Sequence, residues 1–190
     1  MGIFKSVFGR SDPPKANLDN LFAVPSAAIT LEAAAGLRPS GVAAVCFRAA
    51  EGGAFASAQS DVTALLDADA GPPVESVTDE YGYTWLVVRR DPSEVADLVT
   101  DVHAVNSSLE NAGFGPSLLC SVVGFAMQDG RKLALVYLYK TGTFYPFAPE
   151  GDKHRDNALE LQVRGVLHDD LAIEPDLTKW LALYGAPGLS

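Results

Sequence analysis

The side chains that most often carry enzyme chemistry are few in this chain, and they are spread along it. The histidines are His103, His154 and His168, and the cysteines are Cys46 and Cys120. A catalytic nucleophile needs a base within hydrogen-bond reach, whereas each cysteine lies in an apolar stretch that raises a thiol pKa. We therefore expect no catalytic residues, although a site assembled across the fold stays open because such sites are defined by geometry.

Metal and cofactor chemistry has little support in the same residues. His168-Asp169-Asp170 offers an imidazole and carboxylates at the expected end of a helix. Consecutive helical residues point in different directions, so they do not converge on one ion. The chain also lacks a Walker phosphate loop, a Gly-x-Gly-x-x-Gly turn and a Gly-x-Ser-x-Gly elbow. We predict no metal site and no cofactor, and we expect both cysteines to be buried, reduced thiols.

Two polar residues fall on or beside the apolar face of a helix expected at residues 91–112. His103 lies at the margin of that face, where a histidine usually hydrogen-bonds to a neighbour. Asn106 lies within the face, and an amide left there without partners costs about 1–3 kcal/mol. We assign structural roles to both residues, with a bound water or ligand as the alternative for Asn106.

An aromatic stretch, Phe144-Tyr145-Pro146-Phe147, follows a hairpin, and its proline excludes it from the centre of a sheet. Such a segment can line a groove or present anchors to a partner. We name Phe144, Tyr145 and Phe147 as candidate partner-binding residues. The alternative is that these rings close an ordinary core.

The first ten residues form a second candidate binding element, which a Ser-Asp-Pro-Pro linker follows at residues 11–14. The apolar residues at helical spacing are Ile3, Phe4, Val7 and Phe8. A short amphipathic helix can lie on a membrane surface or dock into a partner's groove. We name these four residues as candidate partner-binding residues and expect peripheral membrane contact through residues 1–10. Packing against the rest of the chain, or fraying, is the alternative.

Two hairpins are the clearest structural signals. An Asp129-Gly130 pair joins apolar runs at 118–126 and 132–140, and glycine supplies the positive φ that a tight turn needs. A second hairpin is expected at 74–78 and 83–89, where alternate residues point to opposite faces of the strand. Hairpins imply antiparallel pairing.

Helical segments alternate with these strands. The best-marked helix is 91–112, with Asp91 as its cap, Pro92 at its first position and Gly113 at its end. Further helices are expected at 17–23, 26–35 (with a strand around Ile29 as the alternative), 55–66, 159–167 and 176–184, and single strands at 42–48 and 143–147. These patterns predict an α+β fold, in which an antiparallel sheet built from hairpins carries amphipathic helices mainly on one face. We expect one domain at 15–187 after an amphipathic segment and linker at 1–14.

The composition narrows the class of protein further. The chain has 190 residues, of which 48% are hydrophobic and 20% charged, and this balance is typical of a globular protein. A net charge of −10 would be repelled by nucleic acid or by an anionic bilayer, so we expect no nucleic-acid partner. The acidic surface leaves room for a basic protein partner, but solubility alone is the simpler explanation of the charge. No apolar run reaches the roughly 18 residues of a membrane span and we find no secretory signal, so we expect a cytoplasmic protein.

Several longer strings carry no recognised chemistry but are distinctive as sequence. They are LFAVPSAA (21–28), AVCFR (44–48), DEYGYTWLVVRR (79–90), HAVNS (103–107), TFYPFAP (143–149) and DNALEL (156–161). Together they resemble the bacterial PspAB family over about residues 15–187. The resemblance implies a cytoplasmic accessory or regulator that accompanies phage shock protein A (PspA), a coiled-coil protein that protects the inner membrane under envelope stress. It implies no catalytic residues.

The residues and the resemblance lead to one functional prediction. We expect a non-enzymatic accessory protein of a phage-shock-type response that acts through protein contacts, with PspA or another envelope-stress component as its partner, and that can lie peripherally at the inner membrane. A chaperone-like module of the small secretion-chaperone type and a small enzyme with a dispersed site are the alternatives.

Overall fold

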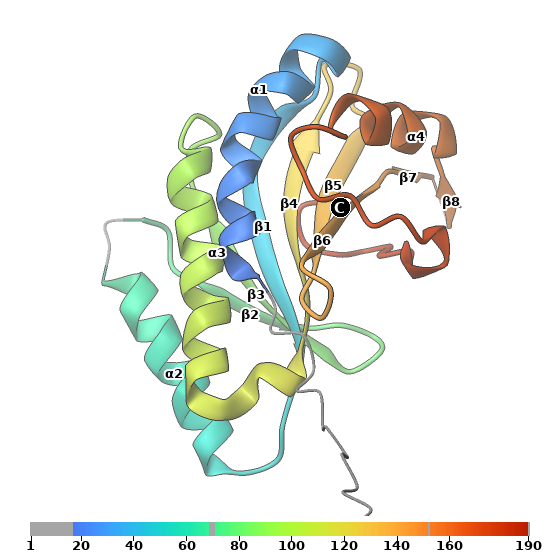
Figure 1. The fold of residues 1–190 in the computed structure, drawn as a ribbon. Coiled ribbons are helices and arrows are strands. Elements are labelled where there is room, and N and C mark those ends of the chain that lie inside the picture. The colour runs from blue at the N-terminus through green and yellow to red at the C-terminus, as the bar shows by residue number, and fades with distance from the viewer. Residues whose placement is uncertain (1–16, 69–70, 152, 190) are drawn as a thin grey trace, which may run out of the picture.

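The computed structural model describes residues 17–68, 71–151 and 153–189, and its centre is a six-stranded antiparallel sheet (Figure 1). The strand order is β2-β3-β1-β4-β5-β6. The bounds are β1 Arg38–Arg48, β2 Glu75–Thr78, β3 Tyr83–Arg89, β4 Leu118–Ala126, β5 Lys132–Leu138 and β6 Thr143–Phe147. A small separate sheet pairs β7 (Pro149–Glu150) with β8 (His154–Arg155). The segment expected at residues 1–14 lies outside the described residues.

Both expected hairpins are present. In the β4–β5 turn Gly130 adopts φ 89°, a conformation that glycine reaches without strain, and the Met127 amide donates to the Arg131 carbonyl at 2.8 Å. In the β2–β3 turn the Asp79 carboxylate accepts hydrogen bonds from the Tyr81 and Tyr83 amides, both at 2.9 Å. The turn residues that the sequence offers therefore form the connections that fix the register of these strand pairs.

The helices lie mainly on one face of the sheet, as the sequence predicts (Figure 1). The α-helices are α1 Val24–Ala35, α2 Gly53–Asp67, α3 Val95–Leu109 and α4 Asn157–Val166, and a 3-10 helix, η1 Leu18–Ala23, leads into α1. Figure 1 shows α1 between α3 and α4, with α2 packed beside α3. Two shorter segments, a π-helical Glu110–Phe114 and a 3-10 Gly115–Ser117, connect α3 to β4.

The start of α3 differs from the expected helix by one turn. The helix begins at Val95, not at Pro92, because the Asp91 carboxylate accepts from both the amide and the hydroxyl of Ser93. These bonds hold residues 91–94 in a turn before the helix. The Glu94 carboxylate accepts from the Asp91 amide at 3.2 Å, so the reciprocal half of the expected capping box is formed in that turn.

The sheet separates two apolar layers, because alternate residues of each strand point to opposite faces. On the helix face, Phe47, Leu86 and Tyr137 join the core beneath the helices. On the other face, Trp85 and Val136 are buried although no helix covers them. That second layer is closed by residues 174–189, which we call the C-terminal strap; its buried apolar members are Trp180, Ala186 and Leu189.

The strap replaces a helix that the sequence predicts at residues 176–184. The structure contains only a single 3-10 turn, η4 Leu177–Lys179, after which Leu181 is 60% exposed. A helix would need the Trp180 carbonyl as an acceptor for the amide four residues later. Arg155 Nη1 donates to that carbonyl at 2.6 Å instead, and Trp180 itself has left the helical conformation, with ψ at 76°.

Candidate functional site

The three aromatic residues proposed as partner anchors are buried. Phe144, Tyr145 and Phe147 are each at most 1% exposed. Tyr145 stacks on Trp180 of the strap with ring centroids 5.8 Å apart. The ring of Phe144 packs against that of Tyr137, with centroids 5.2 Å apart. The surface role assigned to them is therefore corrected to a core role, because β6 is covered on one face by helices and on the other by the strap.

The edge of β6 is also closed. Pro146 does lie in an edge strand, as expected. However, Phe144 donates its amide to the Ala172 carbonyl at 2.8 Å and accepts from the Glu174 amide at 2.7 Å. An incoming peptide strand would need those same backbone groups, so the edge does not offer itself for strand addition at this point.

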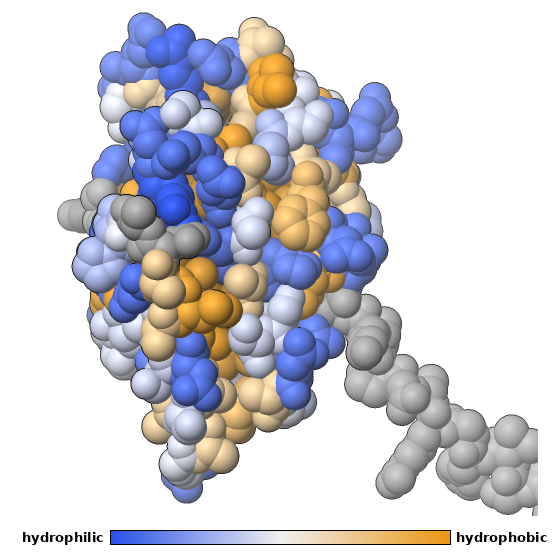
Figure 2. Space-filling model, turned by 90° about the vertical axis from the view of Figure 1, so that its left-hand side faces the viewer, coloured by the Kyte–Doolittle hydropathy of each residue, from blue (hydrophilic) through white to orange (hydrophobic). Residues whose placement is uncertain are grey.

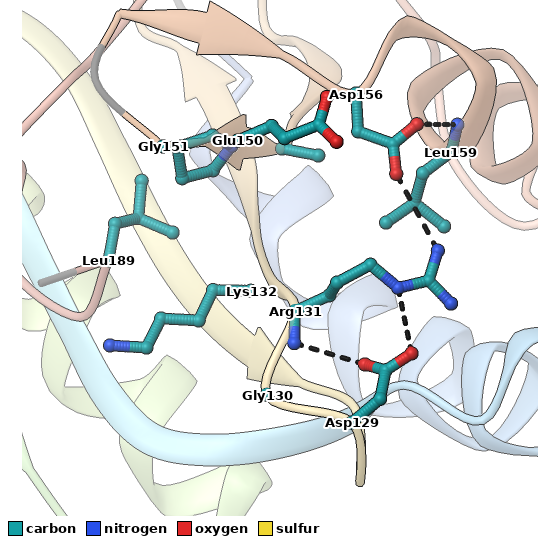
Figure 3. Close-up of a pocket in the computed structure, with 11 residues that line it drawn as sticks. Asp129, Gly130, Arg131, Lys132, Glu150, Gly151, Asp156, Leu159 and Leu189 are labelled. Carbon is teal, nitrogen blue, oxygen red and sulfur yellow. Dashed lines mark hydrogen bonds and ion pairs between the residues drawn. The ribbon is translucent and has the colours of Figure 1, made fainter.

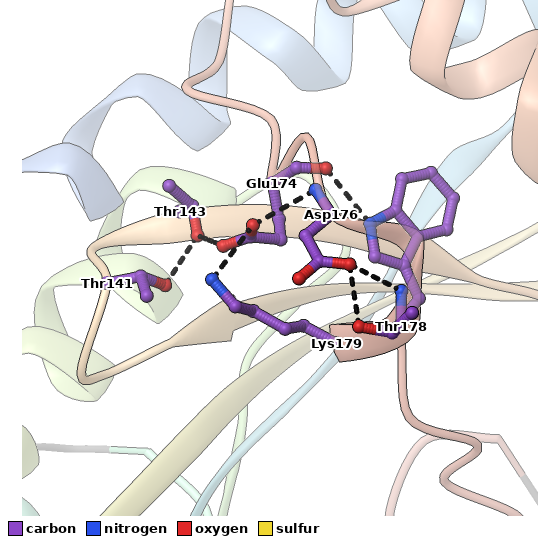
Figure 4. A network of polar contacts seen from close by, with 7 residues as sticks. Thr141, Thr143, Glu174, Asp176, Thr178 and Lys179 are labelled. Atoms are coloured by element: carbon purple, nitrogen blue, oxygen red, sulfur yellow. Dashed lines mark hydrogen bonds and ion pairs between the residues drawn. The ribbon is translucent and has the colours of Figure 1, made fainter.

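A buried carboxylate ties the strap to β6 (Figure 4). Glu174 is 2% exposed, and its carboxylate accepts from Thr143 Oγ1 at 2.7 Å, the Asp176 amide at 3.1 Å and Lys179 Nζ at 3.3 Å. Burial raises the pKa of Glu174, but the bond from Thr143 and the other donors outweigh it and leave the pKa below its ordinary value. The carboxylate is a structural clasp whose acceptor positions are filled.

The remaining predicted binding residues, Ile3, Phe4, Val7 and Phe8, lie outside the described part of the chain. Their role stays a prediction.

The two cysteines face each other across neighbouring strands. Cys46 of β1 and Cys120 of β4 are directly paired in register, and both side chains are buried on the strap side of the sheet. Hydrogen bonding to the Cys120 thiol, followed by burial, raises the pKa of Cys46 far above the ordinary thiol value. His103 belongs to α3 on the opposite side of the sheet, so the fold does not bring an imidazole to either sulfur.

His103 instead takes part in a small cluster at the surface of the helix layer. Its Nε2 lies 3.5 Å from a carboxylate oxygen of Asp19 in η1, and its Nδ1 lies 3.2 Å from Ser107 Oγ. The Phe22 ring packs against the imidazole with centroids 4.6 Å apart. The sequence places His103 and Ser107 four residues apart on one helix. Asp19 and Phe22 come from a distant segment, and no pattern in the sequence indicates that they lie beside His103.

The order Ser107-His103-Asp19 has the connectivity of a catalytic triad without its chemistry. The Ser107 hydroxyl donates to the His103 carbonyl at 2.8 Å, so its proton is directed to the backbone and not to the imidazole. The Asp19 side chain is 84% exposed, unlike the buried carboxylate that orients a catalytic histidine. The cluster attaches η1 to α3, and the expected role of His103 as a hydrogen-bonded boundary residue is confirmed.

Asn106 is a core residue with its partners in place. It is 1% exposed, and its Nδ2 donates to the Val102 carbonyl at 2.8 Å and to Ser121 Oγ at 2.9 Å. Ser121 belongs to β4 and is itself buried, so the pair links α3 to the centre of the sheet. The structural role predicted for Asn106 is confirmed.

A cavity of about 400 Å³ lies between the β4–β5 turn, the small sheet and the start of α4 (Figure 3). Arg131 lies between two acids there, with Nε 2.9 Å from Asp129 and Nη1 3.5 Å from Asp156. Asp156 in turn accepts from the Leu159 amide at 2.9 Å and caps α4. Asp129, Arg131 and Asp156, three of the charged residues that line this cavity, are thus engaged with one another and with the helix end.

Within residues 17–68, 71–151 and 153–189, no group of three or more metal-ligating side chains converges on one point. Over the same ranges, no helix combines the length and the apolar character needed to cross a bilayer.

Apolar side chains are also exposed on the helix layer. Figure 2 shows the side that carries α2 and α3, where apolar patches lie between hydrophilic regions. The large exposed side chains of the layer include Leu65 on α2 and Ile29 on α1, which is 74% exposed. Next to α1, Phe22 is 48% exposed. These residues, together with Leu161 on α4, are among the apolar groups that a partner can reach on the helix side.

The fold and the site define a class of α+β sheet protein in which the conspicuous polar and aromatic side chains hold the structure together. The chain belongs to the PspAB family, described as PspA associated protein B, whose family model matches residues 1–188. Neither a search of curated proteins nor a search of solved structures found a match. The family description indicates association with PspA in a phage-shock-type response.

Proposed function

We propose that this protein is a non-enzymatic accessory or regulator of a phage-shock-type envelope stress response and that it acts by binding PspA. The observation that carries the proposal is the family match over residues 1–188. The family description names PspA, so a protein partner is the simplest activity consistent with it.

The internal bonding of the charged groups supports the absence of catalysis. Arg90, which follows β3, forms an ion pair with Asp101 of α3 at 2.7 Å, and Arg155 bonds to the buried Glu160 at 3.0 Å. Because these groups are engaged with one another inside the fold, they have little freedom for proton transfer or substrate binding. The same holds for Glu174 and Ser107, whose bonds are described above.

The location follows from the same proposal. We place the protein in the cytoplasm, where its two buried thiols remain reduced, with peripheral contact at the inner membrane through residues 1–10. The net charge of −10 makes nucleic acid an unfavourable partner.

Calorimetric titration of the full chain with purified PspA tests the binding. Saturable binding is expected, and an unrelated coiled-coil protein of similar charge serves as the control. Absence of binding to PspA, or equal binding to the control, contradicts the proposal.

A cellular assay tests the non-enzymatic part. A strain that lacks this protein is complemented with Ser107→Ala or Cys120→Ser, each of which removes a nucleophile. Both variants are expected to restore the stress response as the wild type does. Loss of the response in either variant, with folding and PspA binding unchanged, indicates catalysis instead.

A further inference from the structure

Helix α1 carries few polar side chains, namely Ser26, Thr30 and Glu32. Among its residues Val24–Ala35, Glu32 is the only charged one. A helix of this kind is normally buried on all sides, whereas surface helices carry polar residues on the outward face. The composition of α1 is therefore typical of a helix whose outer side is also covered by a partner.

The structure fills only one side of α1. Val24, Ala27 and Leu31 point into the core and are fully buried. The opposite side carries a row of residues at spacings of four, three and four, which we call the outer α1 stripe. Its members, all exposed, are Phe22, Ser26, Ile29 and Ala33. Phe22 lies near the end of η1, and the other three lie on α1.

The stripe has the shape that a docking helix requires. Ile29 and Phe22 project, while Ser26 and Ala33 are small and let another helix approach closely. The Phe22 ring is already held against His103 at 4.6 Å, so little side-chain freedom is lost when a partner covers it. The 4-3-4 spacing matches the alternation of an apolar stripe on a facing helix.

The charge around the stripe indicates the sign of the partner. Neither η1, α1, α2 nor α3 contains a lysine or arginine within its bounds. Asp19, Glu32 and Asp97 supply carboxylates in the same layer; Glu32 pairs with Arg38 at 2.8 Å, Asp19 lies 3.5 Å from His103, and the neighbouring helix α4 carries Arg164. A second copy of this chain, with its net charge of −10, or an anionic bilayer would meet repulsion here.

We propose that the outer α1 stripe binds an amphipathic helix of the partner, one whose apolar stripe is bordered by basic side chains. The inference rests on the proposed function for the identity of that partner, PspA, and it adds the surface and the mode of binding.

The test compares two exposed leucine or isoleucine positions on different helices. Ile29→Glu places a charge in the stripe, and Leu65→Glu places the same charge at a 61% exposed position of α2. Both variants are titrated into PspA as full chains, after circular dichroism has verified that they fold. Ile29→Glu is expected to weaken binding by at least about tenfold, as for a central interface residue, and Leu65→Glu to bind like the wild type.

The outcomes separate the two proposals. Failure of the wild-type chain to bind PspA overturns the proposed function and this inference with it. If the wild type binds and Ile29→Glu binds equally well, the stripe is wrong and the proposed function stands.

Other occupants of the stripe give their own results, each of which overturns the inference. A wild-type dimer that Ile29→Glu converts to a monomer, measured by light scattering, identifies a second copy. Flotation with vesicles of phosphatidylglycerol that Ile29→Glu abolishes identifies a bilayer. Loss of PspA binding in Phe4→Asp but not in Ile29→Glu moves the contact to the N-terminal segment.

Discussion

Individual polar residues in this protein are informative because several buried ones, Asn106, Ser121 and Glu174 among them, have specific partners, whereas the buried Tyr137 hydroxyl has none among the described residues. Asn106 and Ser121 meet between α3 and β4, where neither could reach water. Truncating one of them leaves the other with an unpaired group in the core, and that penalty is larger than the loss of a surface hydrogen bond.

Asn106→Ala is expected to lower the free energy of unfolding by about 1–3 kcal/mol, because it leaves the Ser121 hydroxyl without its partner. Urea denaturation followed by circular dichroism measures the change. Thr100→Ala removes an exposed bond on the same helix and serves as the control, with an expected change within about 0.5 kcal/mol. Equal stability of Asn106→Ala and wild type would contradict this account.

Asp79 is expected to make stability depend on acid pH. Burial raises its pKa, but hydrogen bonds from the Trp85 indole and from the Tyr83 and Tyr81 amides outweigh burial, so the pKa lies below the ordinary 3.8. A lowered folded-state pKa means that the carboxylate stabilises the fold above the ordinary value and that this contribution is lost as the pH falls through the folded-state pKa.

The measurement compares urea unfolding of the wild type and Asp79→Asn at neutral pH and near pH 3. The variant is expected to be less stable at neutral pH, because an amide NH2 replaces the carboxylate oxygen that accepts from the Trp85 indole. The difference in unfolding free energy between wild type and variant is expected to shrink in acid. A gap that is the same at both pH values argues against a role of the charge.

The paired thiols are expected to react slowly in the folded protein. Cys46 and Cys120 are buried, and the pKa of Cys46 is raised, so little thiolate is present to attack a reagent. Ellman's reagent is expected to label both cysteines promptly in denaturant and neither promptly in native buffer. Fast labelling of the native protein would show that the strap opens often.

At the scale of elements, the strap is where the structure differs most from the sequence-based prediction, which places a helix at 176–184. Trp180 fills the space over Tyr145, and its indole donates to the Glu174 carbonyl at 3.0 Å. The strap is therefore held by a few large contacts in place of a helix.

Trp180→Ala is expected to destabilise the protein by about 3–5 kcal/mol, as for removal of a buried aromatic ring. Thermal or urea unfolding measures the loss. Leu177→Ala, at a position that is 51% exposed in the same segment, is the matched control and is expected to change little. Similar losses in both variants would mean that the strap is not anchored by Trp180.

The strands and hairpins could be read from the sequence because their signals are local. Alternating residues in β3 and the Asp129-Gly130 turn need no knowledge of the rest of the chain. The helix expected at 176–184 is absent, and the local sequence does not show the long-range contact made there. Arg155, 25 residues earlier in the chain, donates a hydrogen bond to the Trp180 carbonyl. Likewise, the burial of Phe144 depends on what packs over β6, and local periodicity carries no such information.

The same distinction applies to the candidate site. Spacing on one helix indicates that His103 and Ser107 are neighbours, whereas nothing in the sequence brings Asp19 and Phe22 to them. The apolar character of α1 was visible in its residues, but the identity of its exposed side follows only from how it packs against the sheet.

At the scale of the whole molecule, the net charge of −10 governs how the protein meets a partner. In the helix layer, η1, α1, α2 and α3 contain no lysine or arginine within their bounds, whereas α4 carries Arg164. Long-range attraction to a basic helix is therefore expected from the net negative charge. Raising the salt concentration from about 0.1 to about 1 M shortens the screening length from about 10 Å to about 3 Å.

The rate of association with PspA is therefore expected to fall as salt is added, while the dissociation rate changes less. Stopped-flow fluorescence over a series of sodium chloride concentrations measures both rates. An association rate that is independent of salt would mean that apolar contacts alone bring the two proteins together.

The strap also has a consequence for the order in which the protein is made. Residues 174–189 leave the ribosome after every strand of the large sheet, so the nascent sheet exposes Trp85 and Val136 to water until they arrive. Such a chain offers a temporary sticky surface to chaperones and to other nascent chains. Synthesis that stalls before Trp180 is translated would leave a product with a complete sheet and one uncovered side, which is a substrate for aggregation or proteolysis.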